Sequence, residues 1–257
     1  MATVISTPAE RLQNHPGTVE QHWREHPRMA QVPEVGAAQL VPAGSRAVVV
    51  APHPDDEVLG CAGLLMALAQ AGRDILLIAV SDGEGSHASG SAMSAGLLAQ
   101  LRPAETIAAL GVLELVQVDI MRANIPDSRV AEHRLKLQDL LLAYVQRSDT
   151  LLASWHLDGH PDHDAVGEVC RDVGRRIGCH VIEVPVWLWH WRQPDDGDIP
   201  WHSARKLALD QEQVERKAQA LQCYRSQLEP DLSTGNAAVL SNEVLAHFLR
   251  PYEIYFV

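Results

Sequence analysis

The chain has 257 residues, of which 46% are apolar and 21% are charged, with 17 Gly and 15 Pro. This balance excludes a collagen-like or disordered chain, and the length suits one or two domains. The net charge is −12, and Lys and Arg are scattered along the sequence. A nucleic-acid partner is therefore not expected, because a phosphate backbone is bound by clustered cations.

The sequence gives no indication of secretion or membrane insertion. The first 41 residues are polar and contain no apolar stretch of the kind that forms a secretion signal. The longest aliphatic run, residues 75–80, is far too short to span a bilayer. The four cysteines form no Cys-x-x-Cys pair, and we expect them to be small buried side chains in a reducing compartment. These features predict a cytoplasmic protein with no transmembrane segment.

Short aliphatic runs alternate with longer amphipathic stretches along the chain. Strands are predicted at residues 46–51, 75–80, 112–119 and 151–155, and helices at residues 57–71, 96–110, 129–146 and 162–177. Residues 181–191 are predicted to be extended, and residues 203–227 to form one long helix. The alternation is typical of βαβ units, so we expect an α/β fold with one mostly parallel sheet and helices on both faces.

No internal repeat and no obvious interdomain linker interrupts this pattern. One domain over residues 45–257, preceded by an N-terminal extension over residues 1–44, is the simplest organisation. In such folds a ligand binds outside the carboxyl ends of the strands. We therefore expect functional residues where the predicted strands end.

Two polar blocks stand at such places. One is residues 53–57, His-Pro-Asp-Asp-Glu, and the other is residues 160–163, His-Pro-Asp-His. His53 and Asp56 are three residues apart at a helix start, and His163 can reach them from a neighbouring strand. Histidine and carboxylate are the usual ligands of a catalytic zinc. Helix capping explains one or two of the aspartates but not the repeated His-Pro-Asp, so the pattern favours a metal site.

These blocks make the sequence resemble the PIG-L family, also called LmbE-like zinc-dependent N-deacetylases. That family is marked by a His-Pro-Asp-Asp-Glu block after the first strand and a His-Pro-Asp-His block later. The likeness covers residues 47–257 and includes Arg102-Pro103-Ala104-Glu105, Leu110-Gly111-Val112, Ile125-Pro126-Asp127, Lys217 and Tyr224-Arg225-Ser226-Gln227. It implies a single-domain, Rossmann-like α/β fold.

The resemblance also implies a reaction, the removal of an N-acetyl group from an N-acetylamino sugar of the N-acetylglucosamine type by a zinc-activated water. His53, Asp56 and His163 would hold Zn²⁺, although Fe²⁺ suits the same set of two histidines and one carboxylate. Asp55 would be the general base. A protonated His160 would stabilise the oxyanion that forms on the amide carbonyl.

Three further residues have two interpretations each. Asp162 would either orient His160 or a metal ligand from behind, or cap the helix that begins beside it. Arg102 and Asp127 hold the sugar in the family, but an ordinary surface ion pair and a turn residue are the simpler alternatives. For these two we favour contact with the substrate.

The tryptophans at positions 187, 189 and 191 alternate, so on a strand they would share one face. Such a stripe could stack on a sugar or an aglycone. It is more often part of a core or a subunit interface, and we favour that interpretation.

The main functional hypothesis is thus a zinc-dependent N-deacetylase whose partner is a small N-acetyl sugar or glycoconjugate. An alternative is the same chemistry on another N-acyl group, in a glycolipid, a glycopeptide or an aminoglycoside precursor. A sugar-binding protein without activity is disfavoured, because all five residues needed for turnover are present. The sequence leaves open whether the protein forms a homo-oligomer.

Overall fold

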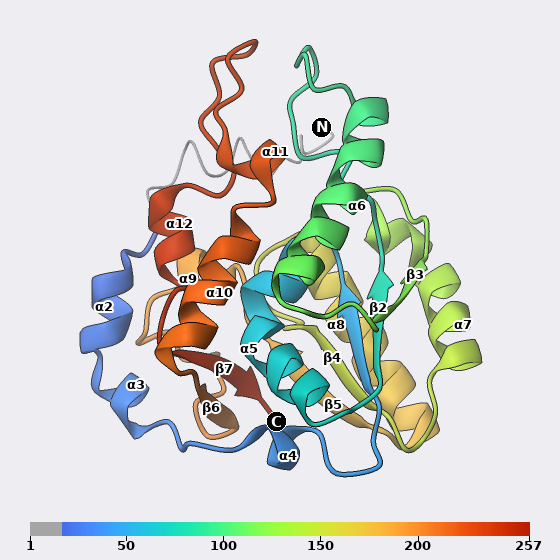
Figure 1. Ribbon diagram of the computed structural model, residues 1–257, viewed down its shortest axis with the longest axis vertical. Coiled ribbons are helices and arrows are strands. Elements are labelled where there is room, and N and C mark those ends of the chain that lie inside the picture. The colour runs from blue at the N-terminus through green and yellow to red at the C-terminus, as the bar shows by residue number, and fades with distance from the viewer. Residues whose placement is uncertain (1–16) are drawn as a thin grey trace.

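The computed structural model describes residues 17–257, which form a mixed sheet with helices on both faces (Figure 1). In this part of the chain the sheet has seven strands in the order β3-β2-β1-β4-β5-β7-β6. The strands are β1 Ala47–Ala51, β2 Ile75–Ala79, β3 Asp119–Arg122, β4 Thr150–Ser154, β5 His180–Val184, β6 Ala204–Ala208 and β7 Tyr252–Phe256. Strands β1 to β5 pair in parallel, whereas β7 is antiparallel to β5 and β6. The predicted α/β class is confirmed.

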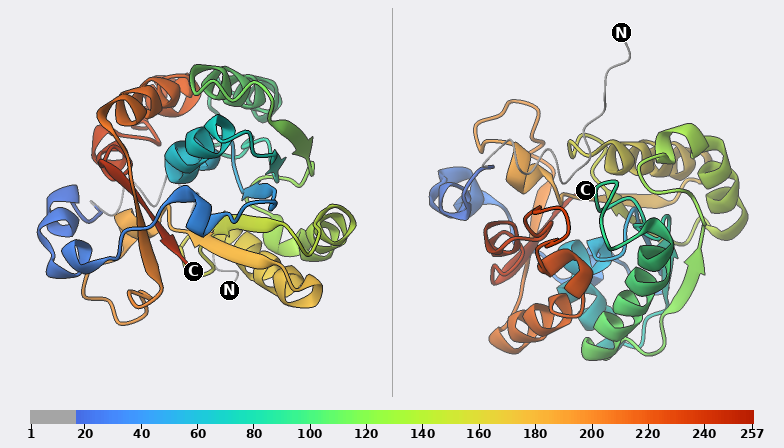
Figure 2. Two further views of the ribbon diagram at one scale, coloured as in Figure 1. Left: turned by 60° about the horizontal axis from the view of Figure 1, so that its bottom comes forward. Right: turned by 90° about the horizontal axis from the view of Figure 1, so that it is seen from above.

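Two layers of helices cover the sheet (Figure 2). One layer contains α5 Asp56–Gln70, α6 Ala95–Val112 and α10 Gln211–Leu221, and the other contains α7 Arg134–Tyr144 and α8 Pro161–Ile177. Successive strand residues point to opposite faces. Val49 of β1 therefore packs with the first layer and Val48 with the second. Because both faces are covered, the central strands are continuous apolar runs in the sequence.

The close packing of α8 against the end of β4 sets the position of the second His-Pro-Asp block. A Cβ on Gly167 of α8 would lie 2.5 Å from the carbonyl oxygen of Ser154, the last residue of β4. Only glycine allows this approach, in spite of its low helix propensity. The helix ends at Gly178, whose φ of +78° forms a left-handed cap.

Residues 17–44 pack against the sheet through three short helices, α2 Glu20–Glu25, α3 Pro27–Gln31 and α4 Ala37–Leu40. The Trp23 side chain is fully buried, and its indole N–H donates to the carbonyl oxygen of Trp189 over 2.7 Å. Glu20 forms ion pairs with His247 and Arg250 near the C-terminus. Apolar side chains of this segment, such as Trp23, Met29 and Leu40, thus belong to the main core cluster. The domain boundary at residue 45 stays a prediction, and residues 1–16 lie outside the described part.

The third strand begins later than the predicted residues 112–119. Helix α6 continues through Gly111 to Val112, and the turn that follows holds Glu114 at a φ of +60°. Leu113 and Leu115 have the apolar character of a strand, but they are buried in the turn. The prediction of a strand over these residues is therefore wrong, and β3 starts at Asp119.

The predicted helix over residues 203–227 is also wrong in its first part. Ala204–Ala208 is the edge strand β6, paired with β7. Helix α10 begins only after Asp210, whose carboxylate accepts the N–H of Gln213 as a helix cap. The chain then breaks before the short helix α11, Arg225–Leu228. Pairing with a strand from the C-terminus overrides the local helical pattern.

The tryptophan stripe is helical, where the sequence predicts an extended chain. Helix α9 spans Leu188–Trp191, so the three indoles do not share one face. Trp187 and Trp191 stack with ring centroids 5.7 Å apart, whereas Trp189 packs edge-on against Trp23 at 5.0 Å. Trp187 and Trp189 are buried, so they contribute to the core in this structure.

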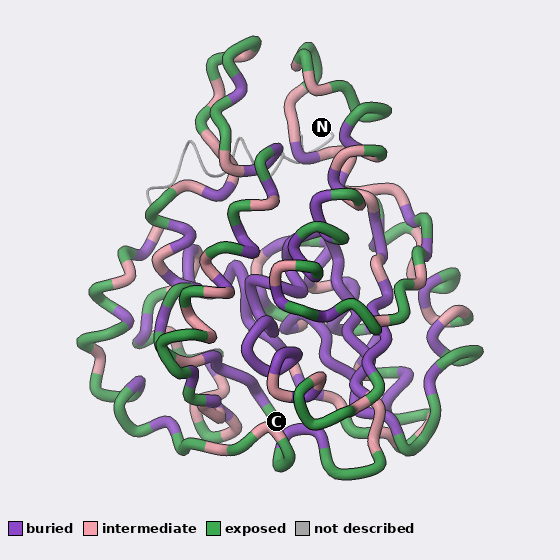
Figure 3. The backbone as a smooth tube through the Cα atoms, in the orientation of Figure 1, coloured by how far each residue is buried: buried purple, intermediate pink, exposed green. Residues whose placement is uncertain are grey.

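Buried residues fill the sheet and the inner sides of its helices, exposed residues lie around the outside, and two loops project from one end (Figure 3). One loop precedes α6 and the other lies between α11 and α12, Asn242–Ala246 (Figure 1). The loops touch where the N–H of Ala92 donates to the Ser233 hydroxyl over 2.8 Å. Among the helices of residues 17–257, none has the length and apolar character needed to cross a membrane.

Candidate metal centre and its pocket

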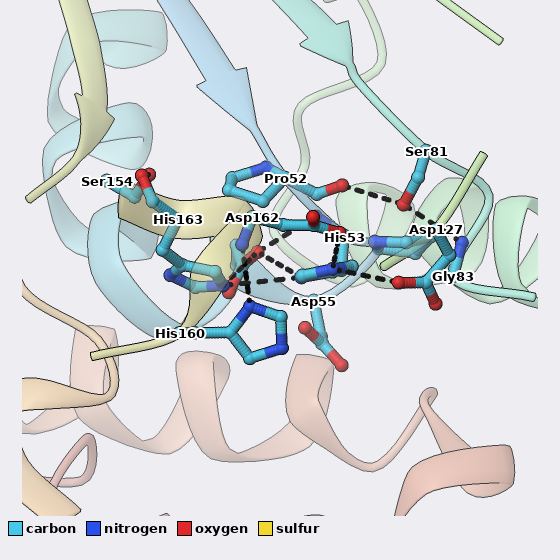
Figure 4. A network of polar contacts seen from close by, with 12 residues as sticks. Pro52, His53, Asp55, Ser81, Gly83, Asp127, Ser154, His160, Asp162 and His163 are labelled. Atoms are coloured by element: carbon cyan, nitrogen blue, oxygen red, sulfur yellow. Dashed lines mark hydrogen bonds and ion pairs between the residues drawn. The ribbon is translucent and has the colours of Figure 1, made fainter. Parts of the chain in front are cut away.

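The two His-Pro-Asp blocks lie side by side because the strands before them are neighbours. β1 and β4 pair in parallel, so both blocks leave the sheet at its carboxyl edge. In Figure 4 the side chains of His53, His160 and His163 converge on one region. Their ring centroids are 4.9 to 5.3 Å apart. These three side chains thus meet at the carboxyl ends of β1 and β4, which is the place that the sequence predicts for functional residues.

His53, Asp56 and His163 form a compact triangle of three ligand atoms. His53 Nδ1 lies 3.3 Å from His163 Nε2 and 3.4 Å from Asp56 Oδ2, and the third side, from His163 Nε2 to Asp56 Oδ2, measures 3.3 Å. Bonds of about 2.0–2.1 Å to a tetrahedral ion place the ligand atoms about 3.3 Å apart. The donor set and its spacing therefore fit a metal such as zinc.

Two other groups of possible ligand atoms share residues with this triangle, and His53 belongs to both. The first group is His53, His160 and His163, and the second is His53, Asp127 and Asp162, in each case with ligand atoms within 4.8 Å of one another. The contacts of His53 with the two aspartates are made by Nε2. Since Nδ1 faces the triangle, the aspartates are better placed as partners behind the ligand than as ligands.

The charged neighbours of Asp56 favour its ionised form. Burial alone would raise the pKa of Asp56, but His163 and His53 outweigh it and hold the pKa well below its usual range. Its Oδ2 also accepts the backbone N–H of His53 over 2.9 Å. A carboxylate that stays ionised at neutral pH is a suitable ligand for a cation.

Two buried carboxylates orient His53 from behind. His53 Nε2 lies 3.2 Å from Asp127 Oδ1 and 3.3 Å from Asp162 Oδ2. Burial would lower the pKa of His53, but Asp127, Asp162 and Asp56 together raise it well above its ordinary value. Carboxylates that accept the second N–H of a ligating imidazole fix the orientation of its ring.

The side chain of Asp162 does not cap its own helix. Its carboxylate accepts the backbone N–H groups of Ser128 and Val130, over 2.7 and 3.0 Å, in addition to its contact with His53. Of the two predicted roles, the structure places this side chain behind a proposed metal ligand. It also ties the loop after β3 to the site.

His163 is held in the same manner by Asp158. Its Nδ1 lies 2.9 Å from Asp158 Oδ2, and both side chains are fully buried. Burial would lower the pKa of His163, but Asp56 and Asp158 raise it to about 9. Asp158 lies two residues before the second block, and the sequence pattern assigns it no role.

Asp55 has an unusual backbone conformation and points into the pocket. Its φ is +119°, a region that side chains other than glycine rarely adopt. Its N–H donates to Glu57 Oε2 over 3.1 Å, and Glu57 Oε1 in turn accepts the Tyr224 hydroxyl over 2.7 Å. These bonds hold the strained residue just before α5.

The Asp55 carboxyl is buried beside one cation and two further acids. Burial raises its pKa, Arg102 opposes this, and Asp56 and Glu57 raise it further, to about 8. A carboxyl group with such a pKa exchanges a proton near neutral pH. This is the property that a general base and acid requires.

Arg102 lines the pocket from α6 and is almost fully buried, so it does not form the surface ion pair considered as an alternative. Its guanidinium donates to the carbonyl oxygens of Gly83 and Pro54, each over 2.7 Å, and to Asp55 Oδ2 over 3.0 Å. Gly83 has a φ of +66°, and a Cβ there would collide with the guanidinium. The contacts of Arg102 thus position Asp55.

His160 caps α8 and faces the pocket without joining the triangle. Its Nδ1 accepts the backbone N–H of Asp162 over 3.2 Å, which leaves the proton of a neutral ring on Nε2. Burial, together with His53 and His163, lowers its pKa well below the ordinary value. We therefore expect a neutral Nε2–H donor in the resting site, whereas the family resemblance implies a protonated ring.

The pocket above the triangle is open to solvent and, with that open space included, has an empty volume of about 410 Å³. All of the predicted catalytic and substrate-binding residues, Asp55, His160, Arg102 and Asp127, line it. Trp187 of the tryptophan stripe also lines the pocket, as do Ser86, Gln227, Val239 and Leu240, to which the sequence pattern assigns no role. The family motif that contains Gln227 could have indicated its place in the site. Val239 and Leu240 come from the loop before α12, where the sequence has no recognisable motif.

Comparison with known protein families matches residues 48–173 to PIG-L, described as GlcNAc-PI de-N-acetylase. This range runs from β1 into α8 and so contains the whole triangle and Asp55. Residues 48–173 belong to the PIG-L family. The resemblance drawn from the two His-Pro-Asp blocks is confirmed.

Solved structures share the PIG-L fold of this chain. The A40926 pseudoaglycone deacetylase Dbv21 is 18% identical over 82% of this chain and 96% of its own, with a TM-score of 0.57. The N,N'-diacetylchitobiose deacetylase from Pyrococcus horikoshii is 22% identical over 74% and 73%, with a TM-score of 0.50. The 4-carboxy-2-hydroxymuconate hydratase GalB from Pseudomonas putida KT2440 is 20% identical over 71% and 80%, with a TM-score of 0.50. One fold thus serves different reactions, and the reaction of this protein must be argued from its site.

Proposed function

We propose that this protein is a metal-dependent hydrolase that removes the N-acetyl group from an N-acetylamino sugar. The observation that carries the proposal is the triangle of His53, Asp56 and His163, with Asp55 beside it in one pocket. These three residues would hold Zn²⁺, and the same donor set suits Fe²⁺. When bound, such an ion polarises an amide carbonyl and makes water a stronger nucleophile at neutral pH.

Asp55 is the residue placed to move the protons of the reaction. Its carboxyl lines the pocket, and it is adjacent in sequence to Asp56 without being part of the triangle. It would take a proton from the attacking water and return it to the departing amine. Arg102 donates to the Asp55 carboxyl, and the backbone N–H of Asp55 donates to Glu57, so the carboxyl is held in one orientation.

His160 is the donor for the charge that develops on the amide carbonyl oxygen. Its ring lines the pocket, and the bond from the Asp162 N–H leaves its Nε2–H free to donate. A fixed donor in a buried site stabilises an oxyanion more than water does, because it needs no reorganisation. The ring is neutral at rest, so it would act as a hydrogen-bond donor and not as a preformed cation.

The remaining walls of the pocket suit a sugar ring. Trp187, Val239 and Leu240 form an apolar side, and Ser86, Gln227 and Asp127 supply hydroxyl, amide and carboxylate groups. A pyranose ring has an apolar face and a rim of hydroxyl groups, which such walls can contact together. The Pyrococcus horikoshii relative is a deacetylase of N,N'-diacetylchitobiose, and this name supports an amino-sugar substrate.

A panel of amides tests the proposal. The purified, zinc-loaded protein is incubated with N-acetylglucosamine, N,N'-diacetylchitobiose and an N-acetylated amino acid, and released acetate is measured. Acetate from a sugar, lost in Asp55→Ala, supports the proposal. Longer N-acyl derivatives of the same sugars test the alternative hypothesis. If the protein hydrolyses them faster than the N-acetyl compounds, its natural substrate carries a larger acyl group. No acyl release from any compound would contradict the function.

A further inference from the structure

The buried carboxylate of Asp158 joins two parts of the site that are far apart in sequence. One partner is His163, whose Nδ1 lies 2.9 Å from Oδ2. The others are consecutive backbone N–H groups, from Val186 and Leu188 to Oδ1 over 2.9 and 3.0 Å, and from Trp187 to Oδ2 over 2.8 Å. The three N–H groups thus donate hydrogen bonds to this carboxylate, and His163 adds a close ionic contact.

The three N–H groups lie where the chain leaves β5 and turns into α9. No side chain of α9 itself caps this helix, so Asp158 supplies acceptors that its first turn lacks. The turn places the Trp187 ring in the pocket wall, stacked on His160 with centroids 6.4 Å apart and an interplanar angle of 23°. The same carboxylate therefore holds the turn that forms this wall of the pocket and contacts the ring of His163.

We propose that Asp158 is a positioning residue that couples the metal ligand His163 to the pocket wall formed by Trp187. This inference rests on the proposed metal centre. Removing the charge leaves the His163 Nδ1–H without its ionic partner and at least one buried N–H of residues 186–188 without an acceptor. Because both contacts share one group, fixing His163 also fixes residues 186–188, and the coupling works equally in the other direction.

The first test measures zinc binding by competition with a chelating dye, using the full chain and Asp158→Asn. Loss of a carboxylate behind a ligand typically weakens metal binding 10–100-fold, and we expect the zinc Kd to rise by about that factor. Asp172→Asn is the control, because Asp172 lies farther along the same helix, α8, and pairs with Arg175 at the surface. Its zinc Kd should stay within about twofold of the original value, as expected for a residue outside the coupled set.

The second test uses the unaltered protein and does not depend on the folding of a variant. Hydrogen exchange of the amides of residues 186–188 is followed with and without zinc. We expect slower exchange in the zinc-loaded protein, with no such change at the amides of β6, a strand at the far edge of the sheet. In folded Asp158→Asn, zinc should no longer slow exchange at 186–188.

The outcomes separate this inference from the proposed function. If the unaltered protein binds no zinc, the metal centre fails and the inference fails with it. If zinc binds but exchange at residues 186–188 does not respond, the coupling is refuted while the metal centre stands. An unchanged zinc Kd in folded Asp158→Asn also refutes the coupling.

Discussion

The two blocks share the tripeptide His-Pro-Asp but differ in backbone conformation, and the difference lies in where the helix begins. In the first block α5 begins at Asp56, three residues after His53. In the second block α8 begins at Pro161, directly after His160, which is its cap. The residue three positions after each histidine, Asp56 or His163, nevertheless lies in the triangle. The two blocks thus differ in where their helices begin and in what surrounds them in the fold, although both begin with the same three residues.

The aspartates of the two tripeptides differ most. Asp55 precedes its helix with a φ of +119° and directs its carboxyl into the pocket beside Arg102. Asp162 lies inside the first turn of α8, and its carboxylate lies behind His53 on backbone N–H groups. One aspartate is thus available to substrate, and the other is committed to structure.

The strongest test of this comparison removes His163. We expect His163→Ala to lose its bound metal and all measurable activity, because the triangle keeps only two of its three ligand atoms. Elemental analysis after dialysis measures the metal. The control is His156→Ala, a histidine that also follows β4 but contacts Glu183 over 2.6 Å. Full metal occupancy in His163→Ala would show that the second block supplies no ligand from this position.

Asp55→Ala separates the base from the ligand beside it. We expect kcat to fall by about 10²–10⁴, the usual scale for losing a general base, with nearly full metal content. Asp82→Ala is the control, because that carboxylate pairs with Arg122, the last residue of β3. A variant that loses its metal and recovers activity on reconstitution would reverse the roles of Asp55 and Asp56.

His160→Ala tests whether the first histidine of the second block acts on the transition state. Loss of one oxyanion donor costs about 10²–10³ in rate, so kcat and kcat/KM should fall together while KM changes little. A residue that only caps α8 would instead lower the denaturation midpoint and leave turnover near normal. Steady-state kinetics of the metal-replete variant, with an unfolding curve, distinguish these results.

Tyr224→Phe tests the hydrogen bonds that hold the strained backbone of Asp55 through Glu57. The variant leaves a buried oxygen of Glu57 without its donor, which we expect to cost about 1–3 kcal/mol of unfolding free energy. Because Glu57 holds the N–H of Asp55, kcat should also fall several-fold while metal content is kept. Tyr252→Phe is the control, since Tyr252 packs against Lys206 away from the site. An unaltered denaturant midpoint and kcat would remove Tyr224 from this role.

The parts of the fold that local patterns describe well are the buried parallel strands and the helices that begin with a clear cap. β1, β2, β4 and α8 agree closely with prediction, because a strand covered on both faces must be apolar throughout. The edge strand β6 and the helix at the tryptophans do not agree. Their conformations depend on partners far along the chain, β7 for the former and Asp158 for the latter.

By itself the sequence determined the chemistry available at the carboxyl edge of the sheet. Histidines and aspartates after two buried strands predict a metal site, because parallel neighbouring strands bring their ends together. The tertiary structure decided what each group does there. Burial and partner charges shift the pKa values of His160 and Asp55. The tertiary fold also brings Arg102 into contact with Asp55 and Asp162 into contact with His53. Such effects arise from distances between residues remote in sequence, which no local pattern records.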